Sequence, residues 1–143
     1  MMDASTFVLS GDFGYVILVM IFSIFMIFWM GFQVGAARKK YEVPYPTMYS
    51  NDDRFNCVQR AHQNTLEGYP MYLLLQVLSG LYCPKLAALS GVIWCVGRIF
   101  YAKGYYTGDP NKRLHGSFAY VGLLIMLVLS IIFALNLLKI TNL

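Results

Sequence analysis

The feature that most constrains this chain is a set of apolar stretches long enough to cross a lipid bilayer. Residues 15–32 and 118–138 contain no charged side chain, and residues 86–106 contain only Arg98 and Lys103. A membrane-spanning helix needs roughly 20 predominantly apolar residues, with a range of about 17–25. These three stretches qualify as spans, and a fourth, residues 68–82, qualifies if its helix begins near Asn56.

Charged residues are scarce, because they make up only 13% of the 143 residues while 58% are hydrophobic. A soluble domain has about a quarter of its residues charged. The net charge of +4 could suggest a nucleic-acid partner, but the basic residues lie between the apolar stretches and no nucleic-acid-binding motif is present. We therefore expect a membrane protein with no nucleic-acid partner.

The connections between the apolar stretches predict their arrangement. The turn at residues 82–85 is short and contains Pro84, so the second and third helices are expected to be antiparallel neighbours. The length allows one domain. We predict an all-α, integral-membrane four-helix bundle that occupies residues 1–143, with spans at approximately 12–36, 56–82, 86–107 and 115–138.

The distribution of lysine and arginine predicts the orientation in the membrane. Most basic residues follow the first or the third span, and only Lys85 and Lys139 lie on the opposite side. The positive-inside rule places the two basic loops in the cytosol and both termini across the membrane. The three cysteines, Cys57, Cys83 and Cys95, are widely spaced and form no CxxC pair, so no metal site is expected.

Two groups of polar residues interrupt the apolar stretches at helical spacing. Arg60, Asn64 and Glu67 share one face of the second helix, and Arg98, Tyr101 and Tyr105 share one face of the third. Ionisable groups at membrane depth are rare and usually face a functional site. The two faces could converge on a ligand with carboxylates and an amine, because arginine binds carboxylates and Glu67 would accept from an ammonium.

A structural use of the same charges is the alternative. Arg60 and Glu67 could pair with each other, and Arg98 could extend to lipid headgroups. Tyr101 and Tyr105 could equally be interfacial aromatic residues. Ligand pockets and structural ion networks are both recorded uses of charge within membranes, so the pattern alone leaves the two open.

The residues around both polar faces resemble a known family. Segment 55–70, FNCVQRAHQNTLEGYP, is similar to the second-helix signature of the MAPEG family, the membrane-associated proteins in eicosanoid and glutathione metabolism. Segment 97–113, GRIFYAKGYYTGDPNKR, resembles the third helix of that family and the loop after it. The likeness covers about residues 10–138 and looks closest to the microsomal glutathione S-transferase 3 branch.

The resemblance implies a homotrimer with a glutathione site at each subunit interface. It assigns glutathione binding to the second helix of one subunit, which carries Arg60, Asn64 and Glu67. The neighbouring subunit supplies two tyrosines, Tyr101 and Tyr105. Arg38 matches a basic residue beside the site, and Arg98 matches the arginine that opens the tyrosine motif. The thiol-activating arginine falls on Arg113, if the turn at residues 108–110 is one residue longer than in relatives, or otherwise on Lys112.

The implied function is a glutathione-dependent transferase or peroxidase that acts on lipophilic electrophiles or lipid hydroperoxides. Glutathione would be the co-substrate, and the resemblance implies no metal. The alternative is a non-catalytic protein of the same fold that binds lipid or serves as a structural subunit of a membrane assembly. The expected location is the endoplasmic reticulum membrane with both termini lumenal, and the mitochondrial outer membrane is the second choice.

Overall fold

The computed structural model describes residues 9–140, and the outermost parts of the predicted domain, residues 1–8 and 141–143, lie outside the described residues. Within this range no strand occurs. The structure contains helices only: α1 (Phe13–Lys40), α2 (Asp53–Tyr82), α3 (Pro84–Tyr106), the 3-10 helix η1 (Pro110–Gly116) and α4 (Ala119–Leu137). The prediction of an all-α membrane bundle is confirmed.

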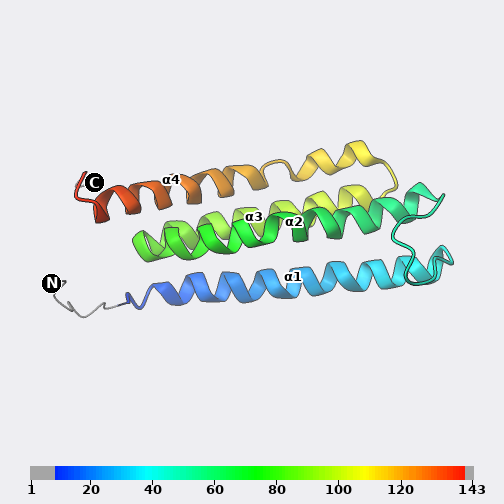
Figure 1. The fold of residues 1–143 in the computed structure, drawn as a ribbon, viewed down its shortest axis with the longest axis horizontal. Helices are drawn as coiled ribbons and strands as arrows, with labels where there is room; N and C mark the ends of the chain where they lie inside the picture. The colour runs from blue at the N-terminus through cyan, green and yellow to red at the C-terminus, as the bar shows by residue number, and fades with distance from the viewer. Residues whose placement is uncertain (1–8, 141–143) are drawn as a thin grey trace.

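The four α-helices lie side by side, with α2 and α3 between α1 and α4 (Figure 1). A single residue, Cys83, joins α2 to α3, and Pro84 occupies the first turn of α3, where its missing N–H is tolerated. The other two connections, residues 41–52 and 107–118, lie at the opposite end of the bundle (Figure 1). We refer to that end as the basic end, because most lysines and arginines lie there.

Three of the described helices, α1, α3 and α4, are long and apolar enough to cross a membrane. Helix α1 has 28 residues and a length of about 42 Å, and it continues past the predicted limit at residue 36. Its last turn carries three basic residues, which suit the negative end of the helix dipole. Helix α2 has 30 residues, but its first half is polar, so its span at 56–82 stays a prediction.

Helix α4 begins at Ala119 rather than near residue 115, because residues 110–116 form η1. Two glycines allow η1 to lie directly against α3. A Cβ atom at Gly104 would overlap the backbone carbonyl of Lys112, and one at Gly116 would overlap the carbonyl of Gly97. The close contact fixes the residues of η1 relative to the last two turns of α3.

Aromatic packing fixes α2 against α3 in the core. The rings of Tyr72 and Trp94 are stacked with a centroid distance of 3.8 Å, and Tyr72 is fully buried. Gln76 of α2 donates to the carbonyl of Ala87 in α3 at 3.2 Å. These contacts set the register of the two helices, so that residues one turn beyond Trp94 in α3 face α2.

The start of α2 is held by its own cap. The carboxylate of Asp52 accepts from the backbone N–H of Arg54 at 2.9 Å and pairs with the Arg54 guanidinium at 2.6 Å. The side-chain bond from Arg54 holds the pKa of the Asp52 carboxyl below its ordinary value. The cap therefore fixes where α2 begins, seven residues before Arg60.

Candidate functional site

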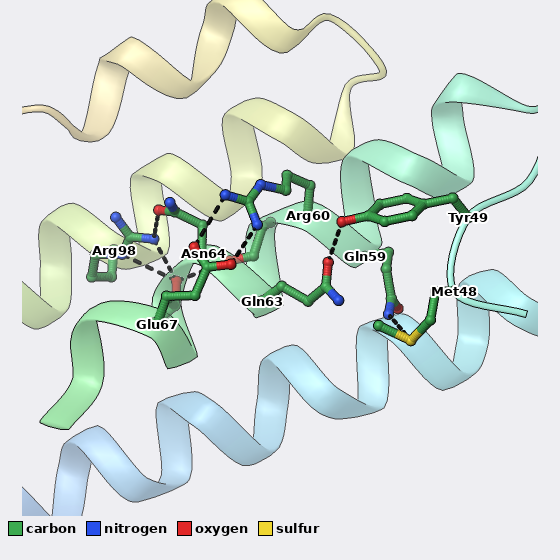
Figure 2. Close-up of polar contacts among 10 residues, drawn as sticks. Met48, Tyr49, Gln59, Arg60, Gln63, Asn64, Glu67 and Arg98 are labelled. Atoms are coloured by element: carbon green, nitrogen blue, oxygen red, sulfur yellow. Dashed lines mark hydrogen bonds and ion pairs between the residues drawn. The ribbon is translucent and has the colours of Figure 1, made fainter. Parts of the chain in front are cut away.

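The polar residues of α2 lie on one face, and two of them are paired (Figure 2). Nη1 of Arg60 lies 2.7 Å from Oε1 of Glu67, and Nη2 lies 3.1 Å from Oε2. The two side chains are 39% and 57% exposed. Because an exposed ion pair is weak, a ligand with its own carboxylate and ammonium can compete for both partners.

Arg98 joins the polar face of α3 to α2. Its side chain is buried, with 6% of the residue exposed. Nη2 donates to Oδ1 of Asn64 at 2.9 Å and to Oγ1 of Thr65 at 2.6 Å, and Nε donates to the same threonine oxygen at 3.1 Å (Figure 2). The structure thus brings the two predicted polar faces together within one chain.

The contacts continue from Arg98 toward η1. Its guanidinium carbon lies 3.9 Å from the ring centroid of Tyr101. Tyr101 meets Tyr105 edge to face, with a centroid distance of 5.1 Å and an interplanar angle of 78°. The guanidinium carbon of Arg113 lies 5.9 Å from the ring centroid of Tyr105. One continuous series of contacts therefore connects Asn64 to Arg113.

Arg113 and Lys112 occupy different environments. The Arg113 side chain is half-buried, and its Nη1 donates to the carbonyl of Pro110 at 2.6 Å, which holds the guanidinium near Tyr105. The Lys112 side chain is exposed and makes no hydrogen bond or ion pair with any residue from 9 to 140. Of the two candidates for the thiol-activating cation, Arg113 is the one that faces the tyrosines.

The family resemblance implies that the neighbouring subunit supplies the tyrosines, and that assignment stays a prediction. In a single chain, Arg98 binds Asn64 and packs on Tyr101, so α2 and α3 present their polar groups side by side. The physical reason is the register set by Tyr72 and Trp94, which points Arg98 at α2 of its own chain.

Arg38 is the predicted site residue that the structure keeps apart from the others. It is 7% exposed, and its Nη1 donates to the carbonyls of Thr47 at 2.9 Å and Pro44 at 3.4 Å. Its guanidinium carbon lies 4.2 Å from the ring centroid of Tyr45. Its Nε has no partner among the described residues. Arg38 therefore orders the α1–α2 connection and faces an outer groove of about 1000 Å³ rather than Arg60.

Sequence reasoning missed two residues at the site. Thr65 accepts both bonds from Arg98 while donating to the carbonyl of Ala61 at 2.9 Å, a bond common for threonine inside helices. Tyr49 donates to Oε1 of Gln63 at 2.6 Å and so ties the α1–α2 connection to α2 (Figure 2). Thr65 could have been noticed as the neighbour of Asn64, whereas Tyr49 lies in a connection without helical spacing.

A polar cleft of about 230 Å³ adjoins these residues and leads into an apolar groove. The cleft is lined by Asn64, Thr65, Glu67 and Arg98, with Gly68 and Trp94 beside them. A groove of about 410 Å³ between α2 and α4 shares Met71, Tyr120 and Leu123 with the cleft, and leucines line most of the rest. A ligand with a polar end and an apolar end would therefore find both surfaces in one place.

No group of three or more histidine, cysteine, aspartate or glutamate side chains lies close enough to hold a metal ion in residues 9–140. The three cysteines are unpaired, and Cys57 and Cys95 are buried.

Comparison with known proteins places these observations in a family. The sequence profile of the MAPEG family matches residues 16–134, which is most of the chain. An uncharacterised protein of Synechocystis sp. is 37% identical over 107 residues, which cover 72% of this chain and 77% of the relative.

The mammalian relatives carry the name microsomal glutathione S-transferase 2. That transferase is a close family member of microsomal glutathione S-transferase 3, whose branch the sequence motifs resemble. The human protein is 35% identical over 98 residues, and the mouse protein is 29% identical over 120 residues. The match covers 68% of this chain and 65% of the human relative, and 83% of this chain and 80% of the mouse relative. The chain thus spans just under two thirds of the length of the human protein.

Proposed function

The chain belongs to the MAPEG family, and on that premise we propose that it is a membrane-bound glutathione S-transferase that acts on lipophilic electrophiles. The observation that carries this proposal is the continuous series of contacts from Asn64 through Arg98, Tyr101 and Tyr105 to Arg113. It supports the proposal because these polar groups are suited to bind a peptide, Arg113 is suited to stabilise a thiolate, and an apolar groove lies beside them.

Glutathione is a tripeptide with two carboxylates, one ammonium group and one thiol. We assign one carboxylate to Arg60, which exchanges its bond to Glu67 for the ligand and leaves Glu67 to accept from the ammonium group. Asn64 offers its side-chain N–H₂ to the peptide, since its oxygen already accepts from Arg98. Arg98 acts on the ligand through Asn64 and Tyr101, which it holds in place.

Arg113 supplies the cation for the chemical step. A thiol has an ordinary pKa near 8.5, so only a few per cent is ionised at pH 7. A guanidinium next to the sulfur favours the thiolate, and each unit by which it lowers the pKa corresponds to about 1.36 kcal/mol. The thiol proton passes to solvent, the sulfur forms a bond to the electrophilic carbon, and the departing group leaves with the electrons of the bond that breaks.

The apolar groove between α2 and α4 supports a lipid as the second substrate. Glutathione reaches the polar cleft from water, while a lipid enters the groove from the bilayer and presents its reactive carbon at the cleft. With a lipid hydroperoxide as the second substrate, the same thiolate would carry out a peroxidase reaction. The thiolate then attacks the outer peroxide oxygen, the O–O bond breaks, and the departing alkoxide takes a proton from solvent to leave as an alcohol. A second glutathione converts the sulfenic acid to a disulfide and water.

The proposal includes the assembly and the location. We propose a homotrimer in the endoplasmic reticulum membrane, with the mitochondrial outer membrane as the alternative, and with the basic end in the cytosol. Arg38 binds the carbonyls of Pro44 and Thr47 and lines a different groove from the polar cleft, so we assign its contact with glutathione to the site of an adjacent subunit. In this arrangement one subunit supplies α2, α3 and η1 to each site, and its neighbour supplies Arg38.

A non-catalytic role is the second candidate, and one observation favours it. Arg60 and Glu67 satisfy each other along α2, as a structural ion network would, and Arg113 is already bound to a backbone carbonyl. On this reading the protein binds lipid in the α2–α4 groove and has no use for glutathione.

Calorimetric titration of glutathione into the detergent-purified protein separates the two candidates. We expect binding, and we expect Arg60→Ala to weaken it by more than tenfold, or about 1.4 kcal/mol. Arg54→Ala is the matched control, because Arg54 lies on the same helix and pairs with Asp52 outside the cleft. No binding by the unmutated protein favours the non-catalytic candidate, and equal affinities for Arg60→Ala and Arg54→Ala remove Arg60 from the site.

A further inference from the structure

A second groove lies between α1 and α3, near the basic end of the bundle. Its volume is about 340 Å³, and it is lined by Phe22, Phe25, Met26, Trp29, Ile99 and Lys103. It shares no lining residue with the polar cleft or with the apolar groove between α2 and α4. The proposed transferase reaction therefore leaves this surface unused.

The groove begins at the depth where a span ends. Lys103 lies one turn before the last residue of α3, Tyr106, and the Trp29 ring lies 5.7 Å from the Tyr106 ring. Tryptophan and tyrosine are enriched at the boundary between membrane and water. From Trp29 the groove extends along α1 toward Phe25 and Phe22, which are one and two turns further from the basic end. It therefore has a polar end at the membrane surface and an apolar body within the membrane.

The polar end carries a cation without a partner. The Lys103 side chain makes no ion pair or hydrogen bond with any residue from 9 to 140, and the indole N–H of Trp29 has no acceptor in the same range. Basic pockets between spanning helices bind anionic lipid headgroups, and a lysine near the boundary can extend its ammonium group into the headgroup layer. The Lys103 ammonium group at this end of the groove is therefore available to bind an anion.

The opposite end of the same two helices provides a contrast. A groove of about 420 Å³ lies there between α1 and α3, and Lys85 is its cation. Nζ of Lys85 lies 3.2 Å from a carboxylate oxygen of Asp12, so this cation has an anionic partner within the protein. Two grooves of similar size on one face therefore differ in the feature that an anionic headgroup would recognise.

We propose that the α1–α3 groove at the basic end is a binding site for an anionic phospholipid of the adjacent leaflet. The ammonium group of Lys103 binds the charged headgroup, and the Trp29 N–H donates to an oxygen of the headgroup or the glycerol esters. One acyl chain lies along Phe22, Phe25 and Met26. A phospholipid fits better than a soluble anion, because every lining residue except Lys103 is a large apolar or aromatic side chain within a span.

Native mass spectrometry of the intact protein in detergent micelles tests this proposal, since both ends of the bundle are then equally accessible to added lipid. The probes are palmitoyl-oleoyl phosphatidylserine and phosphatidylcholine, which have the same chains and differ in headgroup charge. We expect tighter binding of phosphatidylserine, and a loss of about fivefold in Lys103→Gln, which corresponds to about 1 kcal/mol for one cation. Lys103→Arg should retain the affinity.

Lys85→Gln is the matched control, because it removes one positive charge from the same face and leaves Lys103 in place. We expect the affinity of Lys85→Gln for phosphatidylserine to equal that of the unmutated protein. Equal losses in the two glutamine variants would overturn the proposal by showing that only net charge matters. Equal affinity for the two lipids would also overturn it, as would a change of oligomeric state in Lys103→Gln, which would show that protein covers the groove.

Discussion

At the scale of single residues, Arg98 organises the site. It is a buried cation inside a span, and three hydrogen bonds direct it to Asn64 and Thr65. Its stacking on Tyr101 extends the same contact network into the last turns of α3. A buried charge is tolerated only when it is paired or hydrogen-bonded, so Arg98 and its acceptors depend on one another.

We therefore expect Arg98→Ala to damage both stability and binding. Oγ1 of the buried Thr65 would lose both bonds that it accepts from Arg98, and loss of hydrogen bonds to a buried polar atom lowers the free energy of unfolding by about 1–3 kcal/mol. Thermal unfolding followed by circular dichroism should show a lower midpoint, and the affinity for glutathione should fall as Asn64 moves. Arg98→Lys should recover part of each. An unchanged midpoint and affinity in Arg98→Ala would mean that these hydrogen bonds do not position the site.

At the scale of elements, helical spacing accounts for much of what the sequence could predict. The separations of Arg60, Asn64 and Glu67 place them on one face of any α-helix, and the apolar stretches indicate where such helices lie. The arrangement of η1 could not be predicted in this way. It depends on Gly104 and Gly116 meeting backbone atoms far along the chain, a contact that local spacing does not record.

The same limit applies to Arg38 and Tyr49. Arg38 lies in the last turn of α1, where the carbonyls of residues 44 and 47 accept from its guanidinium, and Tyr49 lies in the α1–α2 connection. Tyr49 reaches Gln63 because that connection folds back over α2. Contacts with a connection form only once the helices have packed, so neither side-chain position followed from the sequence pattern.

The close packing of η1 on α3 gives a prediction at this scale. Gly104→Ala would drive a methyl group into the carbonyl of Lys112 and so displace η1, together with Arg113. Such overpacking typically lowers stability by about 1–3 kcal/mol. We expect glutathione conjugation to fall more steeply than glutathione binding, as measured by activity assay and calorimetry on one sample. Gly35→Ala is the control, since a Cβ at that position meets nothing within 4 Å. Equal conjugation and binding in the two variants would show that the position of η1 does not affect the reaction.

At the scale of the whole molecule, the residues of the proposed site do not all lie together in one chain. One chain brings together α2, α3 and η1, whereas Arg38 lies over a different outer groove. We therefore assign the Arg38 contact with glutathione to a second subunit. At each interface of the proposed trimer, one subunit then supplies the half of the site formed by α2, α3 and η1, and its neighbour supplies the half that contains Arg38.

Mixed assemblies test this distribution. Subunits carrying Arg60→Ala and subunits carrying Arg38→Ala should restore some activity when assembled together, because some interfaces combine an intact half from each. A mixture of Arg60→Ala with Arg113→Ala should restore none, since both residues belong to the same half. The activity of co-purified, differently tagged subunits measures the outcome. Recovery in the second mixture alone would place the tyrosines and Arg113 in the neighbouring subunit instead.

The central claim is that Arg113 stabilises the thiolate of bound glutathione, and the ultraviolet absorbance of that thiolate tests it most directly. The unmutated protein should show the absorbance near neutral pH, and Arg113→Ala should lose it while still binding glutathione, because the carboxylates and the ammonium group are held from α2. Lys112→Ala should keep the signal, since that side chain is exposed. Loss of the signal in Lys112→Ala alone, or no signal in the unmutated protein with glutathione bound, would contradict the account.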